Sequence, residues 1–325
     1  MILVTGANGL IGSEVCRLLI SESIPFRTLK RSGSDLSLCD DLEMEWLEGD
    51  VTDLMSIDKS IVGIDTVIHC AAMVSFDEQD KDQMMNVNVK GTENFINCCL
   101  VGDVRNFIHI SSIAALGRSK EKTEINETSQ WIHSSHNTNY AESKHLSELE
   151  VWRGQCEGLN VAIVNPSVVI AAADGTRSSS KLLQYIWEEH KFYINRNISF
   201  VDVRDVAKAI LQIHLESRWG QRYILSNGNL KYQELFTIIA NHLDKNPPKW
   251  NVHMRFMKLG VLLSRALSWI TRRPALVSNE LVKSMQDDFT YSNRKIVDEM
   301  GFQFQKHHET LEWACAKFYK FKQLK

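Results

Sequence analysis

The first twelve residues, MILVTGANGLIG, constrain the fold more than any other part of the chain. An apolar run is followed by three glycines spaced three apart and then by apolar residues at helical spacing. We interpret this pattern as a strand, a tight turn and the start of a helix. Gly6 allows the sharp turn, Gly9 leaves room for a pyrophosphate, and Gly12 lets the helix pack close to the strand.

Phosphates bound at such a turn face the free N–H groups of the helix N-terminus. The turn therefore predicts a dinucleotide site, and an ordinary strand–turn–helix without a ligand is the alternative. The cofactor contacts expected in this stretch are Gly6, Asn8, Gly9, Leu10, Ile11 and Gly12.

Composition sets broad limits on the class of protein. The 325 residues suffice for one large domain or two coupled ones, and a net charge of −3 indicates no general attraction to nucleic acid or anionic membrane. The seven cysteines include no C-x-x-C pair, so we expect reduced thiols in a cytoplasmic protein, with Cys98 and Cys99 buried in a helix.

The chain begins directly with a strand, so we expect no signal peptide. No run reaches the roughly 18 uncharged apolar residues that a membrane span requires. The nearest candidate, residues 256–270, is interrupted by Lys258 and Arg265. We expect it to be a helix packed into a substrate-side domain, and a helix lying on a membrane surface is the alternative.

Short apolar strands alternate with amphipathic helices through the first half of the chain. This alternation predicts an α/β fold in which helices cover both faces of a doubly wound parallel sheet. The expected strands are residues 2–4, 25–29, 44–47, 65–70, 106–111 and 161–165, and the clearest expected helices are residues 83–100 and 139–154.

From Pro166 onward the alternation loosens. Residues 200–205, followed by an apolar-periodic helix to about Leu215 and a short strand at 223–225, indicate that the chain returns to the first domain. The last hundred residues are mostly helical in pattern. We therefore expect a dinucleotide-binding domain of residues 1–165, with 199–226 returning to it. Residues 166–198 and 227–325 are expected to form a smaller, mostly helical substrate-binding domain.

Tyr140 and Lys144 are four residues apart, which places a phenol and an ammonium on one helix face. A tyrosine with its usual pKa of about 10 is a poor acid–base group at neutral pH, and a nearby cation favours the phenolate. The lysine can therefore lower the pKa of the tyrosine while it holds a cofactor ribose. This pair suits proton transfer to or from an oxygen during hydride transfer.

Ser111 and Ser112 end an expected strand, where doubly wound sheets bind their ligands. The Ser112 hydroxyl can donate a hydrogen bond to a substrate carbonyl as negative charge builds on its oxygen. The alternative is a pair of turn-forming serines that cap the next segment.

Taken together, these motifs and several others resemble the extended short-chain dehydrogenase/reductase family, of the NAD-dependent epimerase/dehydratase type. The likeness covers essentially the whole chain. The sequences of the motifs are most similar to those of the dihydroflavonol-reductase-like branch, which reduces ketones or aldehydes with NADPH. The motifs, in order, are Thr5 to Gly12, Asp50-Val51, His69 to Ala72, Asn88 to Thr92, Ser111-Ser112, Tyr140 with Lys144, Asn165 to Val169, and Phe200 to Ala207.

The resemblance implies a catalytic triad of Ser112, Tyr140 and Lys144, with Asn88 supporting the site. It further implies a homodimer through the helices at 83–100 and 139–154. The remaining cofactor contacts that it implies are Asp50 and Val51 at the adenine, Ala71 and Ala72 close to the cofactor, Tyr140, Lys144, Pro166 and Val168.

The end of the second strand bears on the choice of cofactor. An NAD site needs an acidic residue there to bind the ribose 2′-hydroxyl, whereas this chain has Lys30, Arg31 and Ser32. Arg31 can pair with a 2′-phosphate, so we expect NADP(H), with NAD(H) as the alternative. Two solvated basic residues after a strand are the structural alternative.

Two features depart from the family pattern. Many relatives have Gly-Pro after the motif that ends in Ile170, whereas this chain continues with three alanines and an aspartate. The polar stretch 118–139, which contains Trp131, His133 and His136, is expected to form a loop that helps to select the substrate. The two histidines lack the other residues of a metal site, so we expect no metal.

The sequence therefore favours an NADPH-dependent carbonyl reductase or alcohol dehydrogenase. A nucleotide-sugar epimerase with tightly held NAD is the nearest alternative, because Arg177, Lys181 and Arg196 can serve a sugar-nucleotide diphosphate. A dehydratase is less favoured, since such relatives carry acidic residues beside the hydroxyl, where this chain has Ile113 and Ala114. A non-enzymatic NADP-sensing regulator is a third reading, although relatives of that kind usually have a broken triad.

Overall fold

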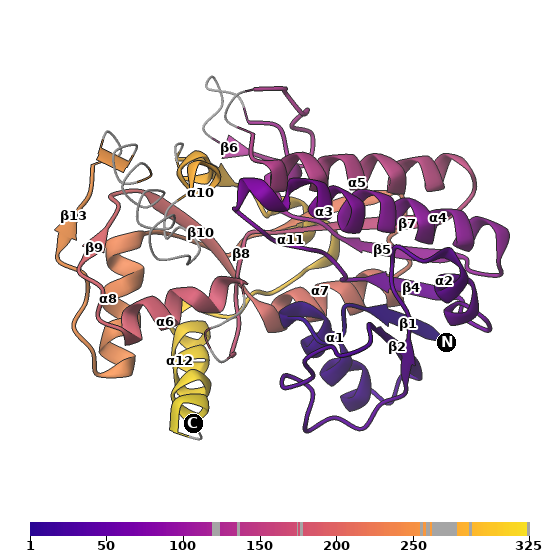
Figure 1. Ribbon diagram of the computed structural model, residues 1–325, viewed down its shortest axis with the longest axis horizontal. Helices are drawn as coiled ribbons and strands as arrows, with labels where there is room; N and C mark the ends of the chain where they lie inside the picture. Colours follow the sequence, from indigo (N-terminus) through magenta and orange to yellow (C-terminus); the bar gives the residue numbers. More distant parts are fainter. Residues whose placement is uncertain are drawn as a thin grey trace.

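A seven-stranded parallel sheet forms the centre of the protein (Figure 1). The computed structural model describes residues 1–118, 124–134, 137–173, 175, 178–253, 256–257, 261, 278–285 and 288–323. The strand order is β11-β7-β5-β4-β1-β2-β3, which confirms the predicted doubly wound sheet. The strands are β1 (Ile2–Thr5), β2 (Phe26–Lys30), β3 (Trp46–Glu48), β4 (Thr66–His69), β5 (Asn106–Ile110), β7 (Asn160–Pro166) and β11 (Gln221–Leu225).

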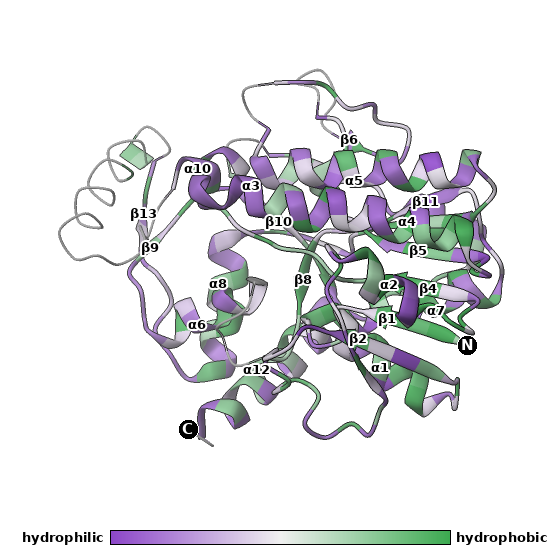
Figure 2. Ribbon diagram, turned by 45° about the vertical axis from the view of Figure 1, so that its right-hand side comes forward, coloured by the Kyte–Doolittle hydropathy of each residue, from purple (hydrophilic) through white to green (hydrophobic). Residues whose placement is uncertain are grey.

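Helices cover both faces of this sheet, because its strands are apolar on both sides. In β1, Leu3 contributes to the core on one face, whereas Ile2 and Val4 contribute to the core on the other. Figure 2 shows these strands as hydrophobic ribbons between helices with hydrophilic outer surfaces. One face is covered by α1 (Leu10–Ser21), α7 (Val203–Leu215) and α11 (Arg294–Met300), and the other by α2 (Leu54–Ser60), α4 (Gly91–Val101) and α5 (Asn139–Cys156).

The helix expected at residues 83–100 is interrupted near its start. A short helix α3 (Lys81–Met85) continues into a π-helical turn, η2 (Asn86–Lys90), and only then into α4. A π-turn of this kind is common at functional sites because it redirects a side chain without ending the helix. Here the turn contains Asn88, which is buried.

A second group of elements lies beside the main sheet (Figure 1). Its three-stranded sheet has the order β12-β10-β8, and its core is shared with three helices. The strands are β8 (Val168–Ile170), β10 (Asn197–Asp202) and β12 (Gly228–Lys231), and the helices are α6 (Lys181–Trp187), α8 (Tyr232–Leu243) and α12 (His307–Gln323).

This sheet corrects one detail of the expected chain path. Residues 200–202 pair in β10 with β8 and β12, so they do not join the main sheet. The return begins at α7, whose residues share the core of α1, and continues with β11 beside β7. The smaller elements are η1 (Glu78–Asp80), η3 (Ile113–Ala115), β6 (Glu124–Ile125), η4 (Ser178–Ser180), β9 (Phe192–Tyr193), β13 (Trp250–Asn251), α10 (Asn279–Ser284) and β14 (Thr290–Tyr291).

Two other expectations can be compared with the described residues. None of the helices in this part of the chain is long and apolar enough to cross a membrane, and most of the segment 256–270 lies outside it. All seven cysteines are free thiols, with Cys99 buried and Cys98 half-buried in α4.

Candidate active site

The predicted site residues converge at the carboxyl ends of β1, β4 and β5. These neighbouring strands lie around the point where the strand order reverses, which is where open parallel sheets bind ligands. Gly6 follows β1, Ala71 follows β4 and Ser112 follows β5, so the topology alone brings these distant segments to one edge.

The glycine turn leaves no room for larger side chains at two positions. Gly6 has a φ of +62°, and a Cβ atom there would lie 2.6 Å from the backbone nitrogen of Ala71. A Cβ atom at Gly12 would lie 2.2 Å from the carbonyl oxygen of Gly6. The close approach at Gly12 is therefore to the turn itself, rather than to the strand as expected. The N–H of Gly9, the N-cap of α1, closes the turn by donating to the carbonyl of Gly6 over 2.9 Å.

A buried hydroxyl connects this turn to the next strand. Thr5 Oγ1 accepts the N–H of Ala71 over 3.2 Å and lies 2.9 Å from Nδ1 of His69. Burial lowers the pKa of His69 to about 3, so its imidazole is neutral at physiological pH. Ala71 is held against the turn, whereas Ala72 is exposed.

The Ser112 side chain interacts with the Tyr140 phenol and lowers its pKa. The Ser112 oxygen also accepts the N–H of Ala114 over 3.1 Å, which makes it the N-cap of η3. Ser112 therefore caps η3 while its side chain also faces the tyrosine. Tyr140 lies in the first turn of α5, which is capped by Thr138 through a 3.0 Å bond from the N–H of Ala141.

Lys144 lies one helical turn after Tyr140 but points away from solvent, with 1% of its surface exposed. Its Nζ donates to the carbonyl oxygen of Ile110 over 2.7 Å and lies 3.4 Å from Nε2 of His109. Burial lowers the pKa of Lys144 to about 8. The pKa of Tyr140 is raised by burial, and the opposing influence is the side chain of Ser112. The expected lowering by the lysine is absent here because the ammonium is directed at Ile110.

Asn88 joins the loop after β4 to the helix that carries Tyr140. Its Oδ1 accepts the N–H of Met73 over 2.7 Å, and its Nδ2 donates to the Met73 carbonyl and to Ser143 Oγ, each over 2.9 Å. Its own carbonyl accepts the hydroxyls of Ser147 and Thr92, over 2.8 and 2.6 Å. The geometry therefore fits the supporting role that was predicted for this residue.

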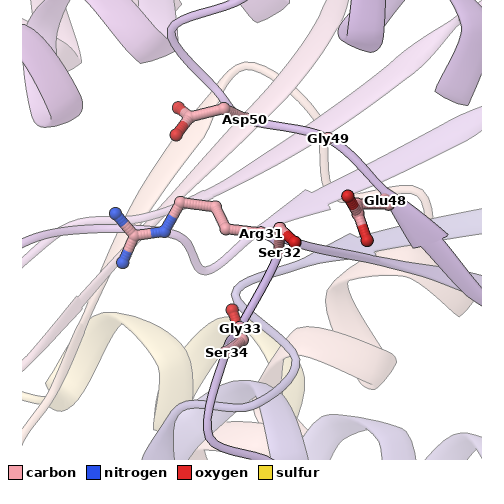
Figure 3. Close-up of a pocket in the computed structure, with 7 residues that line it drawn as sticks. All are labelled: Arg31, Ser32, Gly33, Ser34, Glu48, Gly49 and Asp50. Carbon is pink, nitrogen blue, oxygen red and sulfur yellow. The ribbon is translucent and has the colours of Figure 1, made fainter.

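A pocket of about 430 Å³ opens beside the ends of β2 and β3 (Figure 3). Arg31 is exposed and extends away from Glu48, and its guanidinium has no ion-pair partner among the described residues. Asp50 accepts the N–H and the hydroxyl of Thr52, each over 2.8 Å, and Val51 is buried. The pocket is lined by Arg31, Ser32, Gly33, Ser34, Glu48, Gly49 and Asp50.

Several other predicted residues lie apart from this constellation. Lys30 is directed over the ring of Trp46, at 6.0 Å from its centroid. Pro166 is buried at the end of β7, and Val168 begins β8. In the described ranges, no group of three or more His, Cys, Asp or Glu side chains could hold a metal ion. His133 packs edge-on against Trp131, and His136 lies outside the described residues.

The basic residues considered for a sugar-nucleotide diphosphate are not gathered into one site. Arg196 is ion-paired with Asp288 over 2.9 Å. Lys181 is exposed at the start of α6, and Arg177 lies outside the described residues.

Two buried polar groups were missed by sequence reasoning. His109 lies beside Lys144, and Glu148 accepts bonds from Asn165 and Arg222, each over 2.6 Å. Glu148 was detectable in principle because it follows Lys144 by four residues and so shares its helix face. His109 had no comparable signal, since a histidine in a strand is commonly a core residue.

The sheet order, the glycine turn and the residues at the strand ends define a dinucleotide-binding oxidoreductase fold. Residues 2–225 match the NAD dependent epimerase/dehydratase family, and the chain therefore belongs to that family, within the extended short-chain dehydrogenases/reductases. The family relationship supports an enzyme that uses a nicotinamide cofactor.

Individual relatives agree with this assignment. A Synechocystis sp. protein with the provisional name dihydroflavonol 4-reductase is 26% identical over 92% of this chain and 88% of its own length. Sterol demethylase protein B of Methylococcus capsulatus is 28% identical over 82% and 81% of the two chains. Cinnamoyl-CoA reductase 2 of Medicago truncatula is 28% identical over 75% of this chain and 77% of its own length.

Solved structures show the same fold along the whole chain. The crystal structure of gox2253 has a TM-score of 0.85 and 27% identity, covering 100% of this chain and 99% of its own. The Thermus thermophilus UDP-glucose 4-epimerase in complex with NAD has a TM-score of 0.77 at 17% identity, covering 98% of each chain.

Proposed function

We propose that this protein is an NADP(H)-dependent oxidoreductase that reduces a ketone or aldehyde, or oxidises the corresponding alcohol. The observation that carries the proposal is the placement of Ser112 at the end of β5 beside Tyr140 in the first turn of α5, with Lys144 one helical turn further along. The names of the dihydroflavonol 4-reductase and cinnamoyl-CoA reductase relatives support a reductase.

The residues present fit a nicotinamide dinucleotide. The turn at Gly6 and Gly12 has backbone where any Cβ would clash, and it leads into the N-terminus of α1, whose free N–H groups would bind a phosphate. When bound, the cofactor would supply the hydride that a carbonyl carbon accepts.

The protein's own side chains supply the proton that the carbonyl oxygen receives. Ser112 donates a hydrogen bond to the carbonyl oxygen and polarises it, and Tyr140 transfers its phenolic proton to that oxygen as charge develops. The raised pKa of Tyr140 keeps it protonated at neutral pH, which suits an acid in the direction of reduction. In this proposal, substrate and cofactor draw the Lys144 ammonium toward the tyrosine and the ribose.

The preference for NADP(H) rests on Arg31. Its guanidinium, which has no ion-pair partner among the described residues, lines a pocket next to the end of β2, where a 2′-phosphate would be bound in this fold. The epimerase alternative is less well supported, because Arg196 is already paired with Asp288.

The cofactor preference can be tested by titrating the purified, cofactor-stripped protein with NADPH and with NADH. Quenching of tryptophan fluorescence reports the binding. We expect tighter binding of NADPH, then oxidation of NADPH in the presence of one or more members of a ketone and aldehyde panel. The Tyr140→Phe variant serves as the control and should bind NADPH but turn over at least a hundredfold more slowly. Undiminished turnover by this variant, or NAD that resists stripping together with activity on nucleotide sugars, would reject the proposal.

A further inference from the structure

Glu148 is a carboxylate buried within the protein, on the same helix as Tyr140 and Lys144. None of its surface is exposed. One carboxylate oxygen accepts a hydrogen bond from Arg222 on β11 over 2.6 Å, and the other accepts Nδ2 of Asn165 on β7 over 2.6 Å. A buried charge is maintained only when it is paired and hydrogen-bonded, and both oxygens here have a partner.

Asn165 extends this arrangement to the catalytic serine. The same Nδ2 that donates to Glu148 also donates to the backbone carbonyl of Ser112 over 2.9 Å. Asn165 is itself fully buried. The carboxylate therefore determines where the amide lies, and the amide fixes the backbone of the residue that contacts Tyr140.

Lys144 is connected to Glu148 through their spacing. The two residues are four apart on α5, both are buried, and the negative charge of Glu148 opposes the effect of burial on the lysine. The other charged or titratable groups near this pair come from several elements. They are Cys70 after β4, His69 on β4, His109 on β5, Tyr140 and His145 on α5, and Arg222 on β11.

We propose that Glu148 is a positioning residue that ties two catalytic side chains together: its carboxylate supports the Lys144 ammonium and, through Asn165, fixes the backbone that presents Ser112. The proposal rests on the function proposed above for Ser112, Tyr140 and Lys144. It assigns Glu148 a role in the charge and geometry of the site, distinct from a purely structural ion pair with Arg222.

The effect of the Glu148 charge on Lys144 can be tested by a measurement that does not require catalytic activity. In protein labelled with ¹³C,¹⁵N-lysine, NMR follows the Lys144 Cε–Nζ signal with pH, and the signal is assigned by its absence in Lys144→Met. The wild-type midpoint is expected at about 8. In Glu148→Gln, which keeps the shape of the side chain and removes its charge, the midpoint should be about one pH unit lower.

Glu150→Gln is the matched control for this measurement. It makes the same change on the same helix, but Glu150 pairs with Arg153 on the protein surface. Its Lys144 midpoint should equal that of the wild type. An unchanged midpoint in Glu148→Gln would overturn the charge part of the proposal. Should that variant not fold, Glu148→Gln with Arg222→Gln removes the charge pair together, and the midpoint should again be lower than in the wild type, but by less than in the single variant because the Arg222 cation is lost as well.

The geometric part is tested at Asn165. Asn165→Leu leaves Glu148 and Arg222 in place but removes the amide that holds Ser112. In protein labelled with 3-fluorotyrosine, the ¹⁹F signal of Tyr140, identified by its loss in Tyr140→Phe, should shift and titrate at higher pH because the pKa-lowering influence of Ser112 is weakened. The Lys144 midpoint should stay at its wild-type value.

An unchanged Tyr140 signal in Asn165→Leu would overturn the link to Ser112. Because both NMR measurements report on single side chains, they decide this proposal even if the wild-type protein reduces none of the carbonyls tested. The two proposals can therefore fail separately.

Discussion

The Nζ atom of Lys144 lies 3.4 Å from Nε2 of His109, and both side chains are almost completely buried. Burial lowers the pKa of His109 well below its usual value, and the positive charge of Lys144 adds to this effect. The imidazole is therefore neutral, and its Nε2 can accept a hydrogen bond from the ammonium. Because the pKa of Lys144 is about 8, the lysine can lose its charge within the range in which enzymes are assayed.

This relationship predicts how cofactor binding depends on pH. The Lys144 ammonium is complete below about pH 7 and is lost as the pH rises through about 8, so the contact proposed between this ammonium and the cofactor ribose should weaken. We expect the Kd for NADPH, measured by tryptophan quenching, to rise up to about tenfold between pH 7 and pH 9. In His109→Leu, which removes the acceptor, the rise should begin at lower pH. His242→Leu, an exposed histidine on α8, is the control, and an identical pH dependence in all three proteins would contradict the prediction.

Two glycines of the first turn are predicted to respond differently to alanine. At Gly12 the new Cβ would lie 2.2 Å from the Gly6 carbonyl oxygen, whereas at Gly9 it would lie 3.2 Å from the same atom. Gly12→Ala should therefore destabilise the protein by about 2 kcal/mol or more, since backbone must move. Gly9→Ala should change the free energy of unfolding by less than about 1 kcal/mol but weaken NADPH binding at least tenfold.

For the Gly9→Ala and Gly12→Ala variants, urea unfolding gives the free energy of unfolding, and titration with NADPH gives the affinity. Gly63→Ala provides the comparison for strain alone, because Gly63 has a φ of +74° and nothing within 4 Å of the added Cβ. It should destabilise the protein by about 1 kcal/mol and leave NADPH binding unchanged. If Gly9→Ala bound NADPH normally, the turn would not be the pyrophosphate site.

The central sheet could be predicted because the sequence pattern of each strand lies within a few consecutive residues. Four strands of the central sheet, β1, β4, β5 and β7, are short and mostly apolar runs, and alternation with helices is sufficient to indicate parallel pairing. The three-stranded sheet was not anticipated, because β8 and β10 pair across about thirty intervening residues that carry no repeated pattern. For the same reason the pairing of residues 200–202 with β8 and β12 was not predicted, although these residues were noted as part of a motif.

The candidate site was predictable where a motif determines both residue type and position. Ser112, Tyr140 and Asn88 lie where the motifs indicate, as does the glycine turn. The orientation of Lys144 toward Ile110, however, depends on burial and on acceptors from another strand. Glu148 was missed because a glutamate on a polar helix usually faces solvent, and only the packed structure shows that Arg222 and Asn165 enclose it.

Asp205 on α7 is a buried carboxylate whose removal should stabilise the protein. One oxygen accepts the N–H of Gln305 over 2.9 Å, and within the part of the chain that the structure describes the other has no hydrogen-bond partner. Burial raises the pKa of Asp205 to about 6, so between pH 4 and pH 6 the folded state binds more protons than the unfolded state, and stability falls as the pH rises. Asp205→Asn should therefore raise the free energy of unfolding at pH 7 by about 1–2 kcal/mol.

The gain should vanish below about pH 4, where Asp205 is protonated in both states. Asp202→Asn is the contrasting control, because Asp202 caps α7 through the N–H of Arg204 over 2.8 Å and also pairs with its guanidinium. That variant should be less stable than the wild type at pH 7. Urea unfolding of both variants at pH 4 and pH 7 gives the comparison, and a gain in Asp205→Asn that does not depend on pH would contradict the assignment.

Arg31 should determine which cofactor is bound. Its guanidinium has no ion-pair partner in the described part of the chain, so it pairs with a 2′-phosphate without first breaking a protein contact. A hydrogen bond to a charged group contributes about 1.5–3 kcal/mol, so Arg31→Ala should raise the Kd for NADPH by about 10- to 100-fold. The Kd for NADH should change by less than about twofold, because the 2′-hydroxyl does not require a cation. Arg27→Ala, which removes an arginine of β2 paired with Glu45, should leave both constants unchanged. Equal weakening of NADPH and NADH in Arg31→Ala would mean that Arg31 supports the fold of the pocket and does not recognise the phosphate.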